Sequence, residues 1–392
     1  MNDIDKLPIS DRALRLKPSQ IREVAEAGMG MDDIIPLWFG ETPWQTSHLA
    51  VDAAVDALKS GDHFYQPNSG KPQLRQQICH YQQQLYGQEF NQSRITVTAS
   101  GMQGLALVAQ AITTPNDRIV SILPSWPNVL EAFKISGAEV ICQNLQVKDG
   151  KWALDLDQFI SLLTPNTKAV VLNSPNNPTG WTMPEADMRI LFDHCRKYGI
   201  WLLADDVYAR LYRHGHCAPS FLQWATDEDR FISINSFSKA WSMTGWRLGW
   251  ICAPSALENT FAMLSEFSIA GPAGFVQQAG IKMLQAGEGE VKLLNQRLKA
   301  GYQIASEMLQ QIDGVEFIQP DGAFYCFFKV KAMTDSLQTA KNLLDIAKVG
   351  VAPGAAFGTA GEGYLRICYA QPTDILQPAL ERLAAGLNQA KV

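Results

Sequence analysis

Long apolar runs are missing from this 392-residue sequence. No stretch reaches the roughly 18 consecutive apolar residues of a transmembrane helix. The first residues, which include Asp3, Asp5 and Lys6, form no apolar run like that of a signal peptide. We therefore expect a soluble protein of the cytoplasm with no membrane partner.

Charge is scarce as well. Only 18% of the residues are Asp, Glu, Lys or Arg, the formal net charge is -6, and no basic run occurs. Proteins that bind nucleic acid carry a basic patch or stripe, so no nucleic-acid partner is expected. Hydrophobic residues make up 46% of the chain, which at this length is enough for a large core divided over two or three domains.

Clustered metal and redox ligands are also lacking. The seven cysteines are scattered and contain no C-x-x-C pair, which indicates reduced thiols that mostly fill the core. His214 and His216 are separated by one residue, but no thiol or carboxylate ligand set accompanies them. We predict a solvated loop there and no metal site.

Short β-branched runs alternate with helical stretches between about residues 95 and 255. Most runs are apolar without strict alternation, as expected for strands buried on both faces. This order predicts an α/β fold with a mainly parallel sheet, whose last strand could run against the others. The seven predicted strands are Ile95–Thr98, Arg118–Ile122, Glu139–Cys142, Ala169–Asn173, Ile200–Ala204, Phe231–Asn235 and Leu248–Cys252, and two of the helices between them are Gln103–Ile112 and Glu185–Tyr198.

A long helical pattern at residues 283–312 could bridge two domains. The remainder predicts a smaller α+β unit with strands at Phe324–Val330 and Tyr364–Tyr369. We expect an N-terminal segment, residues 1–45, that packs with the small domain, a large domain of residues 46–288, and a C-terminal small domain of residues 289–392.

Lys239 follows the sixth predicted strand in Ser236-Phe-Ser238-Lys239, and Arg247 lies eight residues on. A lysine amine in a dry site loses its proton more easily and becomes a nucleophile that can form a Schiff base. The planar guanidinium of Arg247 could clamp a phosphate, and Ser236 and Ser238 could add hydroxyl donors. A surface turn with solvated charges is the alternative.

Polar residues follow other predicted strands too, at the edge of an α/β sheet where ligands bind. Asp205 and Tyr208 come after the fifth strand, and a carboxylate there can hold a pyridinium N–H while the phenol binds a ring hydroxyl. Asn177 follows the fourth strand in Asn-Pro-Thr-Gly, where the bond to Pro178 is a candidate cis peptide. A helix cap and a plain turn are the alternatives.

Three further segments carry weaker signals. Gly101, Met102 and Gln103 begin a predicted helix, and amides at a helix start bind anions. Trp126 could stack on a flat ring or simply fill the core. Arg366 lies inside an apolar strand and needs a partner, which could be a substrate carboxylate or a structural ion pair.

Together and in this order, these segments resemble the class I/II aminotransferases, which are fold-type I enzymes that depend on pyridoxal 5′-phosphate (PLP). The resemblance covers nearly the whole chain and rests mainly on Ser-x-Ser-Lys-x(7)-Arg, Asn-Pro-Thr-Gly and Asp-x-x-Tyr. It implies that the large domain binds PLP and that the enzyme moves an amino group from an L-amino acid to a 2-oxo acid by a ping-pong mechanism.

The resemblance also implies a role for each matched residue. Lys239 would carry PLP as an aldimine and then move the substrate proton, while Asp205 would pair with the pyridinium nitrogen and Tyr208 would bind the ring hydroxyl. Tyr65 would reach the phosphate of the neighbouring subunit in a homodimer with shared active sites. The other implied PLP ligands are Gly101, Met102, Gln103, Trp126, Asn177, Ser236, Ser238 and Arg247, and the implied substrate ligands are Gly40, Trp126, Asn177 and Arg366, the last for the α-carboxylate.

The sequence leaves the substrate open. Lys17 matches a lysine that some bacterial aspartate aminotransferases use for the distal carboxylate, but an exposed N-terminal lysine without this role is the alternative. Trp38, Phe39 and Trp44 allow an aromatic or aliphatic substrate, and 2-oxoglutarate is the expected acceptor. A PLP-dependent C–S β-lyase would share the same cofactor residues. A PLP-binding regulator is disfavoured, because neither a helix-turn-helix domain nor a basic patch is present.

Overall fold

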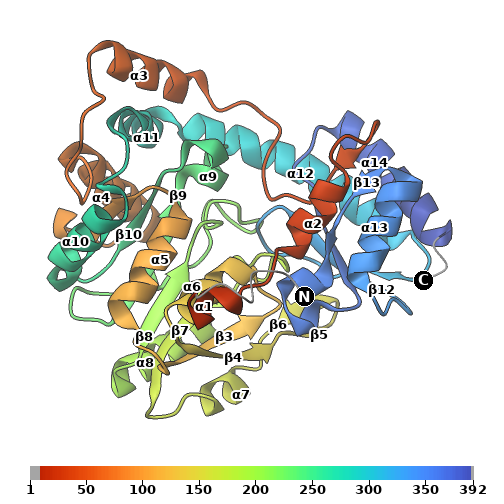
Figure 1. The fold of residues 1–392 in the computed structure, drawn as a ribbon, viewed down its shortest axis with the longest axis horizontal. Coiled ribbons are helices and arrows are strands. Elements are labelled where there is room, and N and C mark those ends of the chain that lie inside the picture. Colours follow the sequence, from red (N-terminus) through yellow and green to blue (C-terminus); the bar gives the residue numbers. More distant parts are fainter. Residues whose placement is uncertain (1–8, 390–392) are drawn as a thin grey trace.

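Seven strands form the larger sheet of the protein (Figure 1). The structure is a computed structural model and describes residues 9–389. The strand order is β2-β10-β9-β8-β7-β3-β4. The strands are β2 (Ile95–Thr98), β3 (Arg118–Leu123), β4 (Glu139–Asn144), β7 (Thr167–Asn173), β8 (Trp201–Asp205), β9 (Phe231–Ser236) and β10 (Gly249–Cys252).

Every predicted strand of this sheet is confirmed, with ends that differ by at most two residues. Strands β4, β3, β7, β8 and β9 pair in parallel. Strand β10 is antiparallel to both of its neighbours, β2 and β9, which decides a direction that the sequence left open. The fold is α/β of the predicted kind, with a mainly parallel sheet.

Residues of the inner strands β3, β7, β8, β9 and β10 enter two separate cores, one on each face of the sheet. In β7, Ala169 and Val171 belong to the core formed with α5 (Gly101–Ile112), α6 (Pro127–Ile135) and α10 (Glu258–Ile269). Val170 and Leu172 belong to the opposite core. That core also contains residues of α4 (Pro72–Tyr86), α8 (Glu185–Tyr198), α9 (Phe237–Ala240) and α11 (Gly274–Ala286). Burial on both faces explains why these strands are apolar throughout.

The helix predicted at residues 283–312 is instead two helices, α11 and α12 (Glu288–Gln310), so this expectation was wrong at its N-terminal end. Gly287 separates them, and a Cβ at this position would lie 2.5 Å from the Met283 carbonyl oxygen. Helix α12 runs from the large sheet to the smaller unit (Figure 1).

The smaller unit contains an antiparallel sheet in the order β11-β12-β15-β14. Helices α2 (Gln20–Ala27), α12, α13 (Ser336–Ala347) and α14 (Thr373–Gln389) lie in the same unit and pack on one another or on its strands (Figure 1). The strands are β11 (Val315–Glu316), β12 (Tyr325–Val330), β14 (Ala352–Pro353) and β15 (Tyr364–Cys368). The two strands predicted here, Phe324–Val330 and Tyr364–Tyr369, are thereby confirmed.

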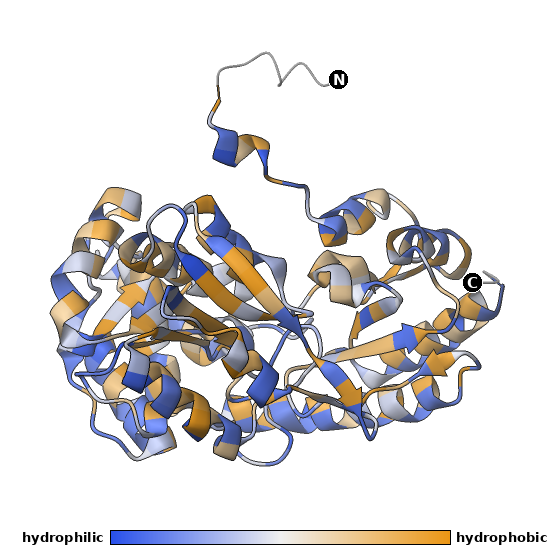
Figure 2. Ribbon diagram, turned by 90° about the horizontal axis from the view of Figure 1, so that it is seen from below, coloured by the Kyte–Doolittle hydropathy of each residue, from blue (hydrophilic) through white to orange (hydrophobic). Residues whose placement is uncertain are grey.

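The described part of the N-terminal segment joins the smaller unit through β1 (Ile35–Pro36), which pairs in parallel with β13 (Val349–Gly350). The short helix α1 (Asp11–Leu14) lies at the edge of the molecule (Figure 2), where the Arg12 guanidinium donates a hydrogen bond to the Ile135 carbonyl at the end of α6 at 3.3 Å. The residue bounds of the three expected domains stay a prediction. Within residues 9–389, no helix combines the length and apolar character that a bilayer crossing requires.

Candidate active site

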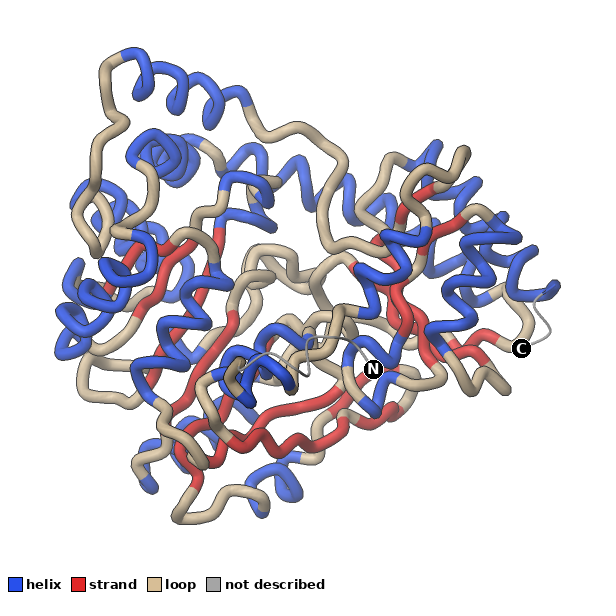
Figure 3. Tube along the Cα trace, viewed as in Figure 1, coloured by secondary structure: helices blue, strands red, loops and turns tan. Residues whose placement is uncertain are grey.

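A cavity of about 440 Å³ lies between the large sheet and the smaller unit, where loops from both gather (Figure 3). The carboxyl ends of β7, β8 and β9 open into it, as expected for ligand sites in α/β folds. The predicted site residues that line the cavity are Gly40, Gly101, Met102, Trp126, Asn177, Asp205, Tyr208, Ser236, Ser238, Lys239, Arg247 and Arg366. Residues that are far apart in sequence therefore form one site.

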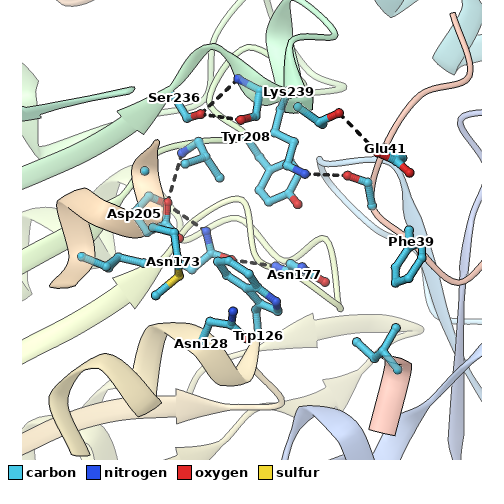
Figure 4. Close-up of a pocket in the computed structure, with 18 of the residues that line it drawn as sticks. Phe39, Glu41, Trp126, Asn128, Asn173, Asn177, Asp205, Tyr208, Ser236 and Lys239 are labelled. Carbon is cyan, nitrogen blue, oxygen red and sulfur yellow. Dashed lines mark hydrogen bonds between the residues drawn. The ribbon is translucent and has the colours of Figure 1, made fainter. Parts of the chain in front are cut away.

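Lys239 lies on α9, directly after β9, and its side chain points into the cavity (Figure 4). The Nζ atom donates a hydrogen bond to the Gly40 carbonyl. Desolvation by the surrounding protein lowers the pKa of Lys239 to about 8. A larger share of this amine is therefore neutral, and so nucleophilic, near neutral pH than for an exposed lysine.

Asp205 ends β8 and is 3% exposed. Its Oδ1 accepts one long hydrogen bond, 3.4 Å from the Val207 amide, and burial raises its pKa to about 7. The neighbouring Asp206 is also buried, but its carboxylate accepts bonds from Ser233 at 2.6 Å and Ser220 at 3.1 Å. Asp205 is thus the carboxyl group that lacks strong donors, and a cationic N–H in the cavity would complete its bonding.

The start of α5 supplies donors on another side of the cavity. Gly101 and Met102 belong to the first turn, where amide N–H groups have no partner within the helix. A Cβ at Gly249 of β10 would lie 2.7 Å from the Gly101 nitrogen, so the glycine permits this close approach. Ser236, Ser238 and Arg247 add two hydroxyls and a guanidinium. This donor set suits an anion such as a phosphate.

Arg366 on β15 is 2% exposed. Its guanidinium donates to Asn177 Oδ1 at 2.8 Å and to the Trp38 carbonyl. Within residues 9–389 its Nε has no hydrogen-bond partner, and no carboxylate forms an ion pair with it. The structural ion pair considered from the sequence is therefore not observed, and a carboxylate ligand would neutralise this buried cation.

Three predicted site residues do not line the cavity. The amide of Gln103 donates to Ser100 Oγ at 3.2 Å, and its side chain bonds the Ala99 amide. Tyr65 is 91% exposed, and Lys17 is exposed as well. Within a single chain, these three positions offer no direct contact with a ligand in the cavity.

Several cavity residues were not predicted from the sequence. Glu41 accepts a hydrogen bond from Thr244 at 3.3 Å, Tyr325 comes from β12, and Arg22 comes from α2. Asn173, which ends β7, holds the Asn177 amide at 2.7 Å (Figure 4). No local motif marks Glu41, Tyr325 or Arg22, because only the packing of the smaller unit against the sheet brings them to the cavity, whereas Asn173 ends a predicted strand.

Of Trp38, Phe39 and Trp44, the three residues that allowed an aromatic or aliphatic substrate, Phe39 lines the cavity and the two tryptophans do not. Trp38 is 8% exposed and packs in the core, where a Cβ at Gly350 would lie 1.9 Å from its ring. Trp44 lies beneath the Arg297 guanidinium at 5.0 Å. The peptide bond between Asn177 and Pro178 is cis, as predicted.

Comparison with known proteins gives consistent matches along the chain. A family model for aminotransferase class I and II matches residues 32–383. An aspartate aminotransferase from Pyrococcus horikoshii is 32% identical over 395 residues, with full coverage of both chains. An arginine–pyruvate transaminase from Pseudomonas aeruginosa is 30% identical and covers 93% of this chain and 92% of its own length.

Solved structures give the same result. The aspartate aminotransferase of Thermus thermophilus with maleate superposes with a TM-score of 0.90 at 29% identity. The match covers 97% of this chain and 100% of that one. The similarity therefore includes the large sheet, the smaller unit and the cavity between them.

Proposed function

Because the chain belongs to the aminotransferase class I and II family, we propose that it binds PLP at Lys239 and moves the amino group of an L-amino acid to a 2-oxo acid by a ping-pong mechanism. One observation carries the proposal. The partly buried amine of Lys239, the carboxyl of Asp205 without strong donors, and the guanidinium of Arg366 without an ion-pair partner line the same cavity. An amine nucleophile, a partner for a ring N–H and a carboxylate receptor are what this reaction requires.

The lining residues fit the cofactor. Asp205 would pair with the ring nitrogen, Trp126 would cover a face of the ring, and Asn177 and Tyr208 would bind the ring hydroxyl. The phosphate would be held by Gly101, Met102, Ser236, Ser238 and Arg247. When bound, PLP supplies an electron sink for the charge that remains after the substrate Cα–H bond breaks.

The chain itself handles the substrate and its proton. Arg366 would bind the α-carboxylate with two parallel hydrogen bonds, as planar guanidinium groups do, and Asn177 would hold Arg366 in place. Lys239, with its lowered pKa, would accept the proton at Nζ and return it. A base whose pKa lies near the working pH is best suited to this exchange.

The rest of the cavity favours a broad choice of donor. Ile21, Phe39 and Met102 give an apolar surface for the side chain of the amino acid, and Arg22 adds a cation. A dicarboxylic acceptor such as 2-oxoglutarate would use this cation, whereas Lys17 lies outside the cavity. The proposed donors are therefore aspartate, aromatic or other amino acids, with 2-oxoglutarate as the acceptor.

Tyr65 belongs to a second proposal about assembly. Because it is 91% exposed in one chain, its expected contact with a phosphate requires a neighbouring subunit. We propose a homodimer in which each Tyr65 completes the cofactor site of the partner subunit.

The decisive experiment adds single amino acids to the PLP-loaded protein in the absence of any 2-oxo acid. Each subunit should release one equivalent of the corresponding oxo acid, while the absorption band of the bound cofactor is lost. Repeated turnover of cysteine-like substrates to pyruvate and ammonia, with the band retained, would instead identify a β-lyase. A purified protein that gains no band from added PLP would contradict the cofactor assignment.

Lys239→Ala tests the anchor of the cofactor. Since the variant lacks both the nucleophile and the proton carrier, turnover should fall by about 10²–10⁴-fold, while slow, noncovalent PLP binding remains. Borohydride reduction should attach the cofactor to the peptide that contains Lys239 in the unchanged protein and to no peptide in the variant. Lys282→Ala, on an exposed position of α11, is the matched control and should label normally.

A further inference from the structure

Two buried phenols connect the large sheet to the smaller unit beside Lys239. Tyr208 follows β8 and Tyr325 begins β12, and they are 3% and 0% exposed. Their hydroxyl oxygens are 2.7 Å apart. Both line the cavity, and Lys239 Nζ lies 5.8 Å from the centre of the Tyr208 ring.

We propose that Tyr325 is a positioning residue, whose hydroxyl donates to the Tyr208 oxygen and thereby directs the single Tyr208 proton toward the ring oxygen of the cofactor. The inference rests on the proposed function, because it concerns the group that Tyr208 is expected to bind. Tyr325 acts through Tyr208 and is not itself assigned a chemical step.

The direction of the bond follows from counting protons. A phenol has one proton to donate, so a Tyr208 hydroxyl that donates to the cofactor must accept from Tyr325. The guanidinium of Arg366 lies 4.4 Å from the centre of the Tyr325 ring. A positive charge at this distance polarises the O–H bond of Tyr325 and makes Tyr325 the better hydrogen-bond donor of the two phenols. Hydrogen bonds in such a chain strengthen one another.

The surrounding packing fixes Tyr325 in this position. A Cβ at residue 40 would lie 1.8 Å from the Tyr325 hydroxyl oxygen, so only a glycine leaves room for the hydroxyl. The carbonyl of the same glycine accepts the hydrogen bond from Lys239. On the other side, the Tyr325 ring makes edge contacts with Phe324 and Tyr208, with centroid distances of 4.9 Å and 5.8 Å. Gly40 thus serves both Tyr325 and Lys239.

The test is a pH titration of the cofactor absorption in the PLP-loaded enzyme, with Tyr325→Phe as the variant. Phenylalanine removes one oxygen atom and keeps the ring under Arg366. A weaker hold of Tyr208 on the ionised ring oxygen should raise the titration midpoint by roughly 0.5–1 pH unit. The turnover number should fall about 3–10-fold, while KM for the amino acid changes less than twofold.

Matched variants separate positioning from general loosening of the core. Tyr369→Phe removes another buried phenol oxygen, which donates to the Ala323 carbonyl at 3.0 Å outside the cavity, and it should leave the midpoint unchanged. Tyr208→Phe should shift the midpoint further than Tyr325→Phe. The double variant should match Tyr208→Phe alone, because Tyr325 acts only through Tyr208.

Two results would overturn this inference and leave the proposed function intact. In the first, the titration midpoint of Tyr325→Phe is unshifted, and in the second, the shift of the double variant equals the sum of the single shifts. An unchanged protein that binds no PLP would overturn the proposed function and this inference with it. The two failures are therefore distinguished by the behaviour of the unchanged enzyme.

Discussion

At the scale of single residues, two cations differ in their access to the substrate. Arg22 lines the cavity and Lys17 does not. We expect Arg22→Ala to raise KM for 2-oxoglutarate by about 5–30-fold, the equivalent of roughly 1–2 kcal/mol of a lost charge-assisted contact. KM for pyruvate, which has no distal carboxylate, should change little.

Lys17→Ala is the matched control for this steady-state comparison. It should leave both KM values within twofold of those of the unchanged enzyme. The reverse pattern, with the loss in Lys17→Ala, would mean that the N-terminal segment moves its lysine to the substrate and that Arg22 has no role in recognition.

Asp205 should make the stability of the cofactor-free protein depend on pH. Burial raises its pKa to about 7 in the folded chain, against about 3.9 for an unfolded aspartate. Between these values the folded state holds the extra proton, so this group's contribution to the free energy of unfolding falls as the pH rises from 4 to 7. Asp205→Asn removes the contribution.

The difference in the free energy of unfolding, variant minus unchanged protein, should therefore rise by roughly 2–3 kcal/mol from pH 5 to pH 8. Urea unfolding at the two pH values measures this difference, with cofactor removed from both proteins. Curves for the two proteins that stay parallel across this range would show that Asp205 is ionised in the folded chain throughout.

At the scale of elements, α12 lies against the chain that follows β15. A Cβ on Gly301 of α12 would lie 2.4 Å from the Tyr369 carbonyl oxygen, which is backbone and cannot rotate aside. We expect Gly301→Ala to lower the free energy of unfolding by about 1–3 kcal/mol, despite the better helix propensity of alanine.

Gly289→Ala in the same helix is the control, because nothing lies within 4 Å of a Cβ there. It should stabilise the protein by at most about 1 kcal/mol. Urea unfolding of the two variants checks the pair, and equal effects would mean that α12 shifts away from Tyr369 at little cost.

The same scale shows what the sequence could predict. Strands such as β7 and β8 are buried on both faces, so they are short apolar runs, and the polar residues that follow them are easily recognised. The break at Gly287 was missed because the apolar pattern continues through it. A glycine inside a helical pattern does not by itself end a helix.

The residues of the site also divide into those that a local sequence pattern predicts and those that it does not. Lys239, Asp205 and Asn177 each follow a predicted strand, and all three line the cavity. Tyr325 and Arg22 were missed because their own segments are ordinary strand and helix. Their place in the cavity depends on how the smaller unit packs against the large sheet, which no local pattern encodes.

At the scale of the whole molecule, exposed aromatic residues gather at one side. Phe64 and Tyr65 are 75% and 91% exposed, and Phe267 on α10 is 85% exposed. A hydrogen bond of 3.0 Å between Asn68 and Glu266 ties their two segments together. Exposed aromatic clusters of this kind mark interaction surfaces, and here the cluster includes the residue proposed to reach the partner subunit.

Phe267→Asp should therefore shift the protein from the proposed dimer toward a single 43.3 kDa chain in sedimentation experiments, because a carboxylate buried at the proposed interface would lack a partner. The variant should also lose PLP faster, since each site would lack the contribution of Tyr65 from the other subunit. Ile190→Asp, on α8 and 53% exposed, is the control and should keep both mass and cofactor. A monomeric Phe267→Asp that retained PLP as firmly as the unchanged enzyme would show that the site is complete within one chain. The role proposed for Tyr65 would then be wrong, although the proposed dimer of the unchanged protein would still stand.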